Sequence, residues 1–330
     1  MTPLSKKTYT GPGNIHMIHL NNESWLNIYD YNIATWKNLY KDCDFKVWGF
    51  EDVKDIIEQS EWCKKFYQIF LNEKSFYPLA LMSDYIRLYI LNKYGGLYVD
   101  TDVFALNRMP ENIFKSKMAL AWDPGIRTKN YTSDYIKKHN IEKTGDVFFW
   151  REYKIPIINN GSFFFSKEEN PILVQEMNIR DDFAKNRFNP EGFHCLSLIE
   201  TLKKFINLNE EEEYQKVLYK NDILILNSNY NAFEPEESYF DYNKSEPIYN
   251  VHQCLLTGYN GPPENLITVS DFSVVFNLFK ERKFIKHQMI LIPINSDLIE
   301  EFNDFSFTLR EFLGPIYKTD YFRIKPMPKL

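Results

Sequence analysis

The sequence predicts an α/β protein with a mixed, mainly parallel sheet flanked by helices. Strand-like and helix-like segments alternate before residue 100, the order in which crossover helices join parallel strands. Hydrophobic residues make up 44% of the 330-residue chain and aromatic residues 17%, so the chain can bury a large core. Residues 83–106 then combine a helix, a Gly-Gly pair, an apolar strand and an Asp-x-Asp pair. In α/β sheets, ligands bind at the carboxyl ends of strands, where this acidic pair lies.

The elements before the acidic pair follow from apolar patterning. Residues 14–20 (NIHMIHL) follow Gly-Pro-Gly and predict the first buried strand. In the predicted helix at 75–93, Met82, Ile86 and Tyr89 recur at the three-to-four spacing of a buried face. The remaining predictions are helices at 25–40, 51–70 and 75–93 and a strand at 45–48.

The elements after the acidic pair are more interrupted. Residues 124–153 are polar and predict a long surface excursion, of the kind that forms lids or acceptor-binding insertions. We expect helices at 170–184 and 193–206, and strands at 97–99, 103–106, 118–122, 155–165, 223–226 and 248–252.

One large domain with two appendages is the expected organisation. It comprises an N-terminal arm at 1–13, a main domain at 14–265 and a C-terminal extension at 266–330 that packs on or beside the main domain. Residues 317–330 (YKTDYFRIKPMPKL) are basic and aromatic. Such a segment can make peripheral contact with an anionic membrane, although a plain surface tail is the simpler interpretation.

Charge and cysteine usage restrict the class of protein. A net charge of −6 argues against a protein that wraps nucleic acid. The four cysteines are scattered without a Cys-x-x-Cys pair, which favours free thiols in a reducing compartment. The N-terminal residues lack the apolar core of a signal peptide, and no stretch reaches the roughly 18–20 apolar residues of a membrane span. We therefore expect a cytoplasmic protein, unless it is exported without a signal of this type.

The central segment predicts a site for a metal ion and a diphosphate. Asp84 and Arg87 are three residues apart on the predicted helix, so both project from one face. The Gly-Gly pair permits the positive φ angles that end a helix, and the short strand after it delivers Asp100 and Asp102. Two carboxylates one residue apart can share a hard divalent cation, whose coordination phosphate oxygens and water complete.

An Asp-x-Asp pair alone is weak evidence. The chain contains a second one, Asp42-Cys43-Asp44, without a glycine turn or a preceding helix. We interpret this copy as an ordinary loop, so the signal at Asp100 and Asp102 lies in its context.

That context resembles a known family. SDYIRLYILNKYGGLYVDTDV is similar to the segment shared by glycosyltransferases that have a sugar-binding region containing a DXD motif. These include initiating mannosyltransferase-like enzymes, bacterial capsule and lipooligosaccharide transferases, and clostridial glucosylating toxins. Trp36 and Trp48 resemble two further family positions upstream. The matched positions of the central motif are Asp84, Arg87, Leu91, Tyr94, Gly95, Gly96, Tyr98, Asp100 and Asp102.

The resemblance implies a GT-A fold and transfer of a sugar from a nucleotide-sugar donor with retention at the anomeric carbon. UDP-sugars are favoured and GDP-sugars are the second option, with a glycan, glycolipid or protein as acceptor. By position, Asp102 would bind Mn²⁺ or Mg²⁺ directly, and Asp100 would contact ribose, sugar or metal-bound water. Asp84 and Arg87 would hold sugar hydroxyls, and Tyr98 would line the donor pocket. The alternative for Asp84 and Arg87 is an ordinary ion pair on a helix surface.

Three further site residues follow more loosely from the resemblance. His19 occupies the place of a family tryptophan that stacks on the nucleotide base. Asn160, or its neighbour Asn159, resembles an asparagine that reaches the donor sugar, with a turn asparagine as the alternative. His252 follows a late strand, where the family often has a histidine that would complete the metal site or contact the diphosphate. A core histidine is the alternative for His252.

Two other functions compete with this interpretation. Asp100-Thr101-Asp102 after an apolar strand also fits the start of a haloacid-dehalogenase-type phosphohydrolase, whose first aspartate is a nucleophile. That fold needs a later acidic pair after a strand, and the adjacent pair Asp181-Asp182 falls in helix-like sequence. A non-catalytic sugar-binding or scaffold protein with a degenerate site is the second competitor.

Overall fold

The computed structural model describes most of the first half of the chain and parts of the second. The described residues are 11–21, 29–73, 77–122, 158, 161–166, 170–186, 193–208, 213, 216–227, 230, 232–233, 249–252, 265–268, 288–294 and 322–328. The predicted excursion at 124–153 lies outside this set.

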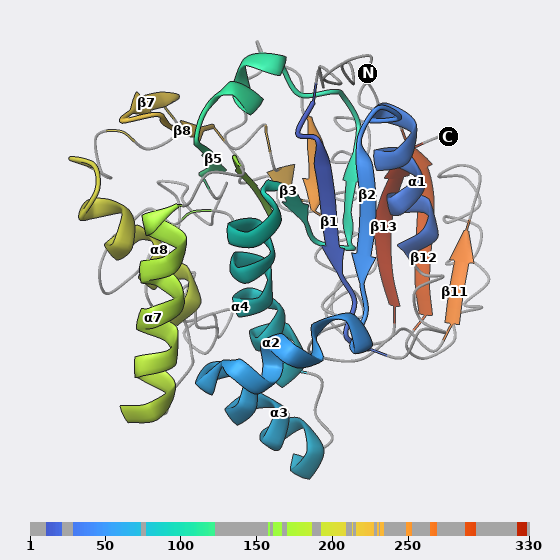
Figure 1. Ribbon diagram of the computed structural model, residues 1–330. Helices are drawn as coiled ribbons and strands as arrows, with labels where there is room; N and C mark the ends of the chain where they lie inside the picture. Colours follow the sequence, from blue (N-terminus) through green and yellow to red (C-terminus); the bar gives the residue numbers. More distant parts are fainter. Residues whose placement is uncertain are drawn as a thin grey trace, which may run out of the picture.

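The main sheet has seven strands in the order β2-β1-β3-β6-β5-β8-β7 (Figure 1). β1 is parallel to β2 and β3, and β5 is parallel to β8. β6 is antiparallel to both β3 and β5, and β7 is antiparallel to β8. The sheet is therefore mixed and flanked by helices, as predicted, but its pairings are three parallel and three antiparallel rather than mainly parallel. Its strands are β1 (Asn14–Ile18), β2 (Asp44–Trp48), β3 (Gly96–Val99), β5 (Met118–Ala121), β6 (Ser162–Phe165), β7 (Leu218–Lys220) and β8 (Ile223–Leu226).

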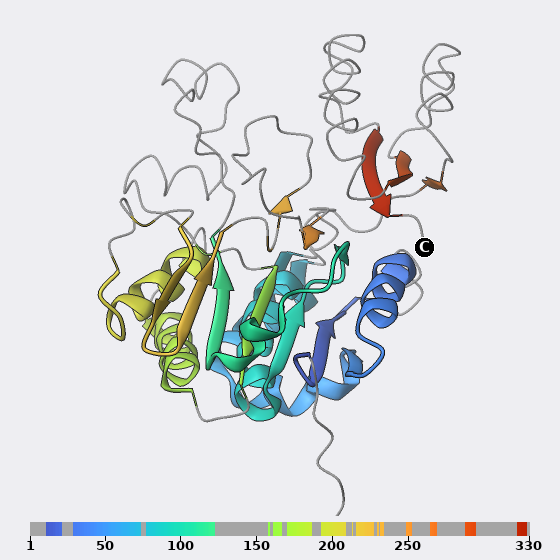
Figure 2. The same ribbon diagram turned by 90° about the horizontal axis from the view of Figure 1, so that it is seen from above.

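The helices cover the two faces of this sheet unequally. α1 lies on one side of the sheet, and the other helices gather on the opposite side (Figures 1 and 2). The core divides in the same way, because alternate residues of a strand point to opposite faces. In β3, Tyr98 packs with the larger group of helices, whereas Leu97 and Val99 pack with α1. The helices are α1 (Asp30–Leu39), α2 (Lys54–Gln59), α3 (Glu61–Glu73), α4 (Tyr77–Tyr94), α7 (Pro171–Asn186) and α8 (Phe193–Lys203), with 3₁₀ turns η2 (Glu51–Val53) and η3 (Glu111–Lys115).

The predicted glycine break between α4 and β3 is confirmed. Gly95 and Gly96 have φ angles of 63° and 104°, a region that side chains with a Cβ rarely adopt. A Cβ on Gly96 would lie 2.5 Å from the carbonyl oxygen of Asn14. Because Asn14 begins β1, the neighbour of β3, glycine at position 96 allows the two strands to pair.

Two three-stranded sheets accompany the main one. The first has the order β4-β10-β9, formed by β4 (Val103–Ala105), β9 (Ala232–Phe233) and β10 (Asn250–His252). The second is parallel and consists of β11 (Asn265–Thr268), β12 (Gln288–Ile294) and β13 (Phe322–Pro328). Half of the segment interpreted above as a plain tail therefore forms a strand, β13. The predicted domain limits at residues 13 and 265 stay predictions.

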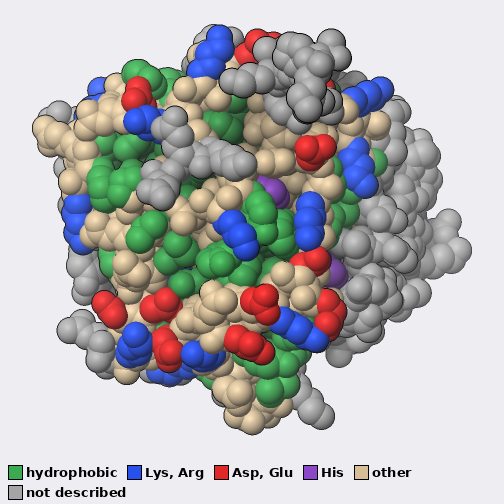
Figure 3. All heavy atoms as spheres, viewed as in Figure 1, with side chains coloured by type: hydrophobic (Ala, Val, Ile, Leu, Met, Phe, Trp, Pro, Cys, Tyr) green, Lys and Arg blue, Asp and Glu red, His purple; other side chains and the backbone are tan. Residues whose placement is uncertain are grey.

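The described surface is mixed in charge. On the face shown in Figure 3, Lys and Arg side chains are interspersed with Asp and Glu. Exposed pairs such as Lys54–Glu51 and Lys64–Glu61 contribute to this pattern. Among the described helices, none is long and apolar enough to cross a membrane.

Candidate active site

The acidic pair lies in a tight turn between β3 and β4. The amide of Asp100 donates to the carbonyl of Gly161 (2.9 Å), which fixes the end of β3 against the start of β6. The amide of Val103 donates to the carbonyl of Asp100 (3.0 Å) and closes the turn. Asp100 and Asp102 therefore stand at the carboxyl end of β3, where the sequence predicted a ligand site.

His252 joins the acidic pair from a segment 150 residues away. β10 is antiparallel to β4 and places His252 opposite Val103. Its Nε2 lies 3.1 Å from Asp102 Oδ1 and 3.9 Å from Asp100 Oδ2. The candidate ligand atoms of Asp100, Asp102 and His252 all lie within 4.8 Å of one another, and each side chain is partly exposed. Two carboxylates and an imidazole at this spacing fit a divalent cation that keeps open positions for other ligands.

Arg87 and Asp84 form a buried pair that extends to the acidic turn. Both residues lie on α4 and are at most 7% exposed. Arg87 Nη2 is 2.7 Å from Asp84 Oδ1 and 3.4 Å from Asp100 Oδ1. The guanidinium also lies over the ring of Tyr98, 4.5 Å from its centroid. An ordinary surface ion pair, the alternative considered for these two residues, is therefore wrong.

Burial governs the protonation of Tyr98 and Asp100. Burial raises the pKa of the Tyr98 phenol well above its ordinary value, so the hydroxyl is a neutral donor. It donates to Asp100 Oδ1, the oxygen that Arg87 also approaches. Burial likewise raises the pKa of Asp100, while the positive charge of Arg87 acts in the opposite direction. Within the described part of the chain, the carboxylates of Asp84 and Asp100 thus gather around Arg87.

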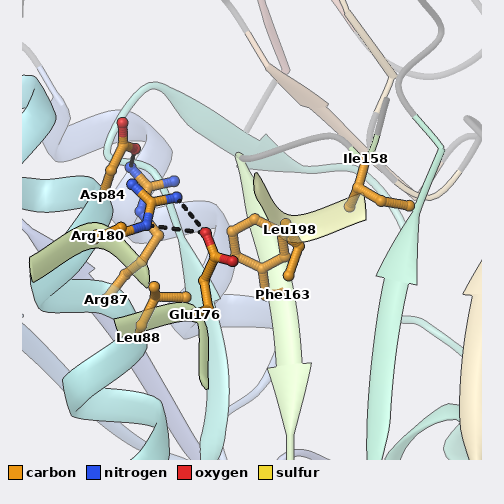
Figure 4. Close-up of a pocket in the computed structure, with 8 residues that line it drawn as sticks. All are labelled: Asp84, Arg87, Leu88, Ile158, Phe163, Glu176, Arg180 and Leu198. Atoms are coloured by element: carbon orange, nitrogen blue, oxygen red, sulfur yellow. Dashed lines mark hydrogen bonds and ion pairs between the residues drawn. The ribbon is translucent and has the colours of Figure 1, made fainter. Parts of the chain in front are cut away.

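A small cavity opens beside this pair and is lined by groups that the sequence analysis did not single out. Its volume is about 20 Å³, and it lies between α4, β6, α7 and α8 (Figure 4). Glu176 and Arg180 of α7 line it, with Arg180 Nη2 3.0 Å from Glu176 Oε1. Their spacing of four residues is a weak sequence signal, because such pairs are common on exposed helices. The remaining lining residues are Asp84, Arg87, Leu88, Ile158, Phe163 and Leu198.

The other predicted site residues are less closely tied to this centre. His19 follows β1, is 7% exposed and meets the ring of Tyr29 edge-on at 5.7 Å. Its role in stacking on a base stays a prediction. Asn160 and Asn159 lie outside the described residues. Asp181 and Asp182 lie within α7, not after a strand as the phosphohydrolase alternative requires.

Comparison with known proteins agrees with the motif. Residues 22–119 match the family model described as "Glycosyltransferase sugar-binding region containing DXD motif". Over this range the chain is similar to the DXD-motif glycosyltransferases. The matched region runs from α1 to β5 and includes the whole acidic turn. No curated protein matches this chain.

Two solved structures of glycosyltransferases are among those similar to this chain. One is the "PaToxG Glycosyltransferase", 17% identical, with a TM-score of 0.37, covering 59% of this chain and 69% of that one. The other is an active-site mutant of LgtC, 11% identical, with a TM-score of 0.38, covering 73% of this chain and 87% of that one.

Proposed function

We propose that the chain is a metal-dependent, retaining glycosyltransferase that uses a nucleotide-diphosphate sugar. UDP-sugars are the favoured donors and GDP-sugars the second option, and the acceptor is a glycan, a glycolipid or a protein. The observation that carries the proposal is the convergence of Asp100, Asp102 and His252 beside the buried pair Arg87–Asp84. Retention at the anomeric carbon rests on the family resemblance alone.

The acidic turn and His252 would hold Mn²⁺ or Mg²⁺. A nitrogen ligand beside two carboxylates favours Mn²⁺ over the harder Mg²⁺. Bound there, the cation would supply Lewis-acid stabilisation of the negative charge on the leaving nucleoside diphosphate. The two oxygens of Asp100 are used differently: Oδ1 faces Tyr98 and Arg87, and Oδ2 faces His252. The protein contacts at Oδ1 thus orient Oδ2 toward the proposed metal position.

Arg87 and Asp84 would orient the donor sugar. The guanidinium of Arg87, held by Asp84 and near Asp100, would make a charge-assisted hydrogen bond to an oxygen of the donor. Asp84 accepts from Arg87, which fixes its carboxylate and leaves acceptor capacity for a sugar hydroxyl. Both side chains are buried, so these contacts would form in a site from which most water is excluded.

Two accompanying expectations rest on the sequence alone. Cytoplasmic location and peripheral membrane contact through the basic C-terminal residues stay predictions.

A donor screen tests the proposal directly. Thermal unfolding of the purified chain would be followed with UDP, GDP and their sugar conjugates, each with Mn²⁺ and with EDTA. We expect one nucleoside diphosphate to raise the melting temperature with Mn²⁺, and EDTA or Asp102→Ala to abolish the rise. NMR of the released sugar or product then gives the anomeric configuration.

The same samples separate the competing functions. Hydrolysis of a phosphomonoester without nucleotide binding would support the phosphohydrolase. Sugar binding without any metal-dependent nucleotide binding would support the scaffold protein.

A further inference from the structure

One face of α1 holds the backbone of the acidic turn. Asn32, Thr35 and Trp36 lie at positions i, i+3 and i+4 of the helix, so they share a face. Their exposed fractions are 2%, 6% and 0%. All three direct polar atoms at the segment between Asp100 and Leu106.

The three contacts fall on alternate residues of that segment. Asn32 Nδ2 donates to the carbonyl of Thr101 (3.1 Å), and Trp36 Nε1 donates to the carbonyl of Val103 (2.9 Å). The amide of Ala105 donates to Thr35 Oγ1 (2.9 Å). In an extended chain, the polar groups of alternate residues point to the same edge. The side chains of α1 therefore occupy the edge of β4 where another strand would otherwise pair.

The opposite edge of β4 pairs with the strand that contains His252. β4 is the outer strand of its sheet, and its inner neighbour is β10, which contains His252. The amide of Leu106 donates to Tyr249 at the base of this pairing (2.9 Å). The acidic turn is thus held between α1 on one edge and β10 on the other.

We propose that Asn32, with Thr35 and Trp36, positions the acidic turn and so sets the separation of Asp100, Asp102 and His252. Asn32 matters most, because the peptide of Thr101 lies between the two aspartates and its orientation directs both side chains. Residues that orient metal ligands typically change metal affinity by about 10- to 100-fold when they are removed. This inference rests on the proposed metal site.

Direct measurement of Mn²⁺ binding without any donor tests the inference. Mn²⁺ titration of the full chain would be followed by EPR, well below the melting temperature. We expect Asn32→Ala to raise the Mn²⁺ Kd about 10-fold or more. Trp36→Phe keeps most of the ring volume but removes the indole N–H, and should raise the Kd less, because Val103 lies outside the acidic pair.

Asn38→Ala is the matched control. Asn38 is an exposed asparagine on the same helix, so its replacement should leave the Mn²⁺ Kd at the wild-type value. Hydrogen exchange of the metal-free chain gives a second readout, with faster exchange of the amides at 100–105 expected in Asn32→Ala and not in Asn38→Ala.

The outcomes separate the two proposals. Wild-type protein that binds Mn²⁺ while Asn32→Ala binds it equally well would overturn the positioning role alone. Wild-type protein that binds neither Mn²⁺ nor Mg²⁺ would overturn the metal mechanism and the positioning role with it.

Discussion

Two buried arginine–carboxylate clusters lie beside the same small cavity and differ in how their charges balance (Figure 4). In the first, on α7, Glu176 is fully buried and pairs with Arg180 one helical turn later. The hydroxyl groups of Ser197 and Thr201 on α8 also donate to Glu176, so both of its oxygens are used. We call this cluster closed because both carboxylate oxygens of Glu176 have partners. It has one negative and one positive charge, and all four residues are helix residues of the core.

The second cluster has an excess of negative charge. Arg87 faces Asp84 and Asp100, and Asp102 and His252 follow next to them. Among the residues that the structure describes, three carboxylates thus share one arginine and a histidine. Closely spaced carboxylates repel each other, and a cation between them relieves that repulsion. The contrast fits a structural role of the α7 cluster in helix packing, whereas the acidic cluster has the ligands for the cation proposed above.

Removing the carboxylate of the closed cluster should lower the free energy of unfolding more than the other substitutions. Glu176→Ala leaves the guanidinium of Arg180 buried without its countercharge, and we expect the free energy of unfolding to fall by about 3–5 kcal/mol. Urea unfolding measures this loss. Asp182→Ala, an exposed acid on the same helix, should change it by less than about 1 kcal/mol. Equal effects of the two substitutions would show that the α7 cluster is not a structural anchor.

Asp102→Asn should lower the transfer rate and leave the free energy of unfolding almost unchanged. The amide keeps the shape of the side chain but removes one of the crowded negative charges. We expect the transfer rate to fall by about 10²- to 10³-fold, the equivalent of several kcal/mol of Lewis-acid stabilisation. The unfolding free energy of the metal-free protein should stay within about 0.5 kcal/mol of wild type. A near-normal rate, measured as release of nucleoside diphosphate, would refute the metal role of Asp102.

Mn²⁺ itself should distinguish the two clusters. At 100 times its Kd, Mn²⁺ should stabilise the wild-type chain by about 2.7 kcal/mol. Asp102→Asn should lose most of this gain. Thr201→Val removes one hydrogen bond to Glu176 in the closed cluster, so it should lower stability yet keep the full response to Mn²⁺. A response that disappears in Thr201→Val as well would mean that the clusters act as one unit.

The contrast also explains which parts of the site the sequence could predict. The helix, the Gly-Gly turn, the strand and the acidic pair all fall within residues 83–106, so local spacing and glycine stereochemistry determine their arrangement. Asp84 and Arg87 were predictable for the same reason. The place of His252 in the site could be predicted only from the family resemblance, because the pairing of β10 with β4 brings it from a distant part of the chain.

Other features depend on packing that no local pattern encodes. Glu176 acquires its hydroxyl partners from a separate helix, α8. In the sequence, nothing distinguishes Asn32 from another helix asparagine, because its contact with Thr101 forms only when α1 packs against the segment of β4. The strand at 162–165 was predictable from its run of phenylalanines, but its antiparallel insertion between β3 and β5 was not.

His16 is a third buried polar group, and like the α7 cluster it is closed. The indole N–H of Trp48 donates to its Nδ1 (3.2 Å), so the ring proton is on Nε2, which donates to the carbonyl of Gly95 (2.9 Å). Both nitrogens are thus engaged in the neutral form. Burial accordingly lowers the pKa of His16 below its ordinary value of 6.5.

Acidification should therefore weaken the fold through His16. Below pH 6.5 the unfolded chain binds a proton at this ring, whereas the folded chain does so only below its lowered pKa. The contribution of His16 to the free energy of unfolding is thus fully present above pH 6.5. It is lost as the pH falls toward the folded-state pKa. In EDTA, wild type should lose more unfolding free energy between pH 7.5 and pH 5 than His16→Gln, by about 1 kcal/mol or less. Equal losses would contradict this role, and an altered Mn²⁺ affinity of His16→Gln at pH 7.5 would show that closed polar groups also control the metal site.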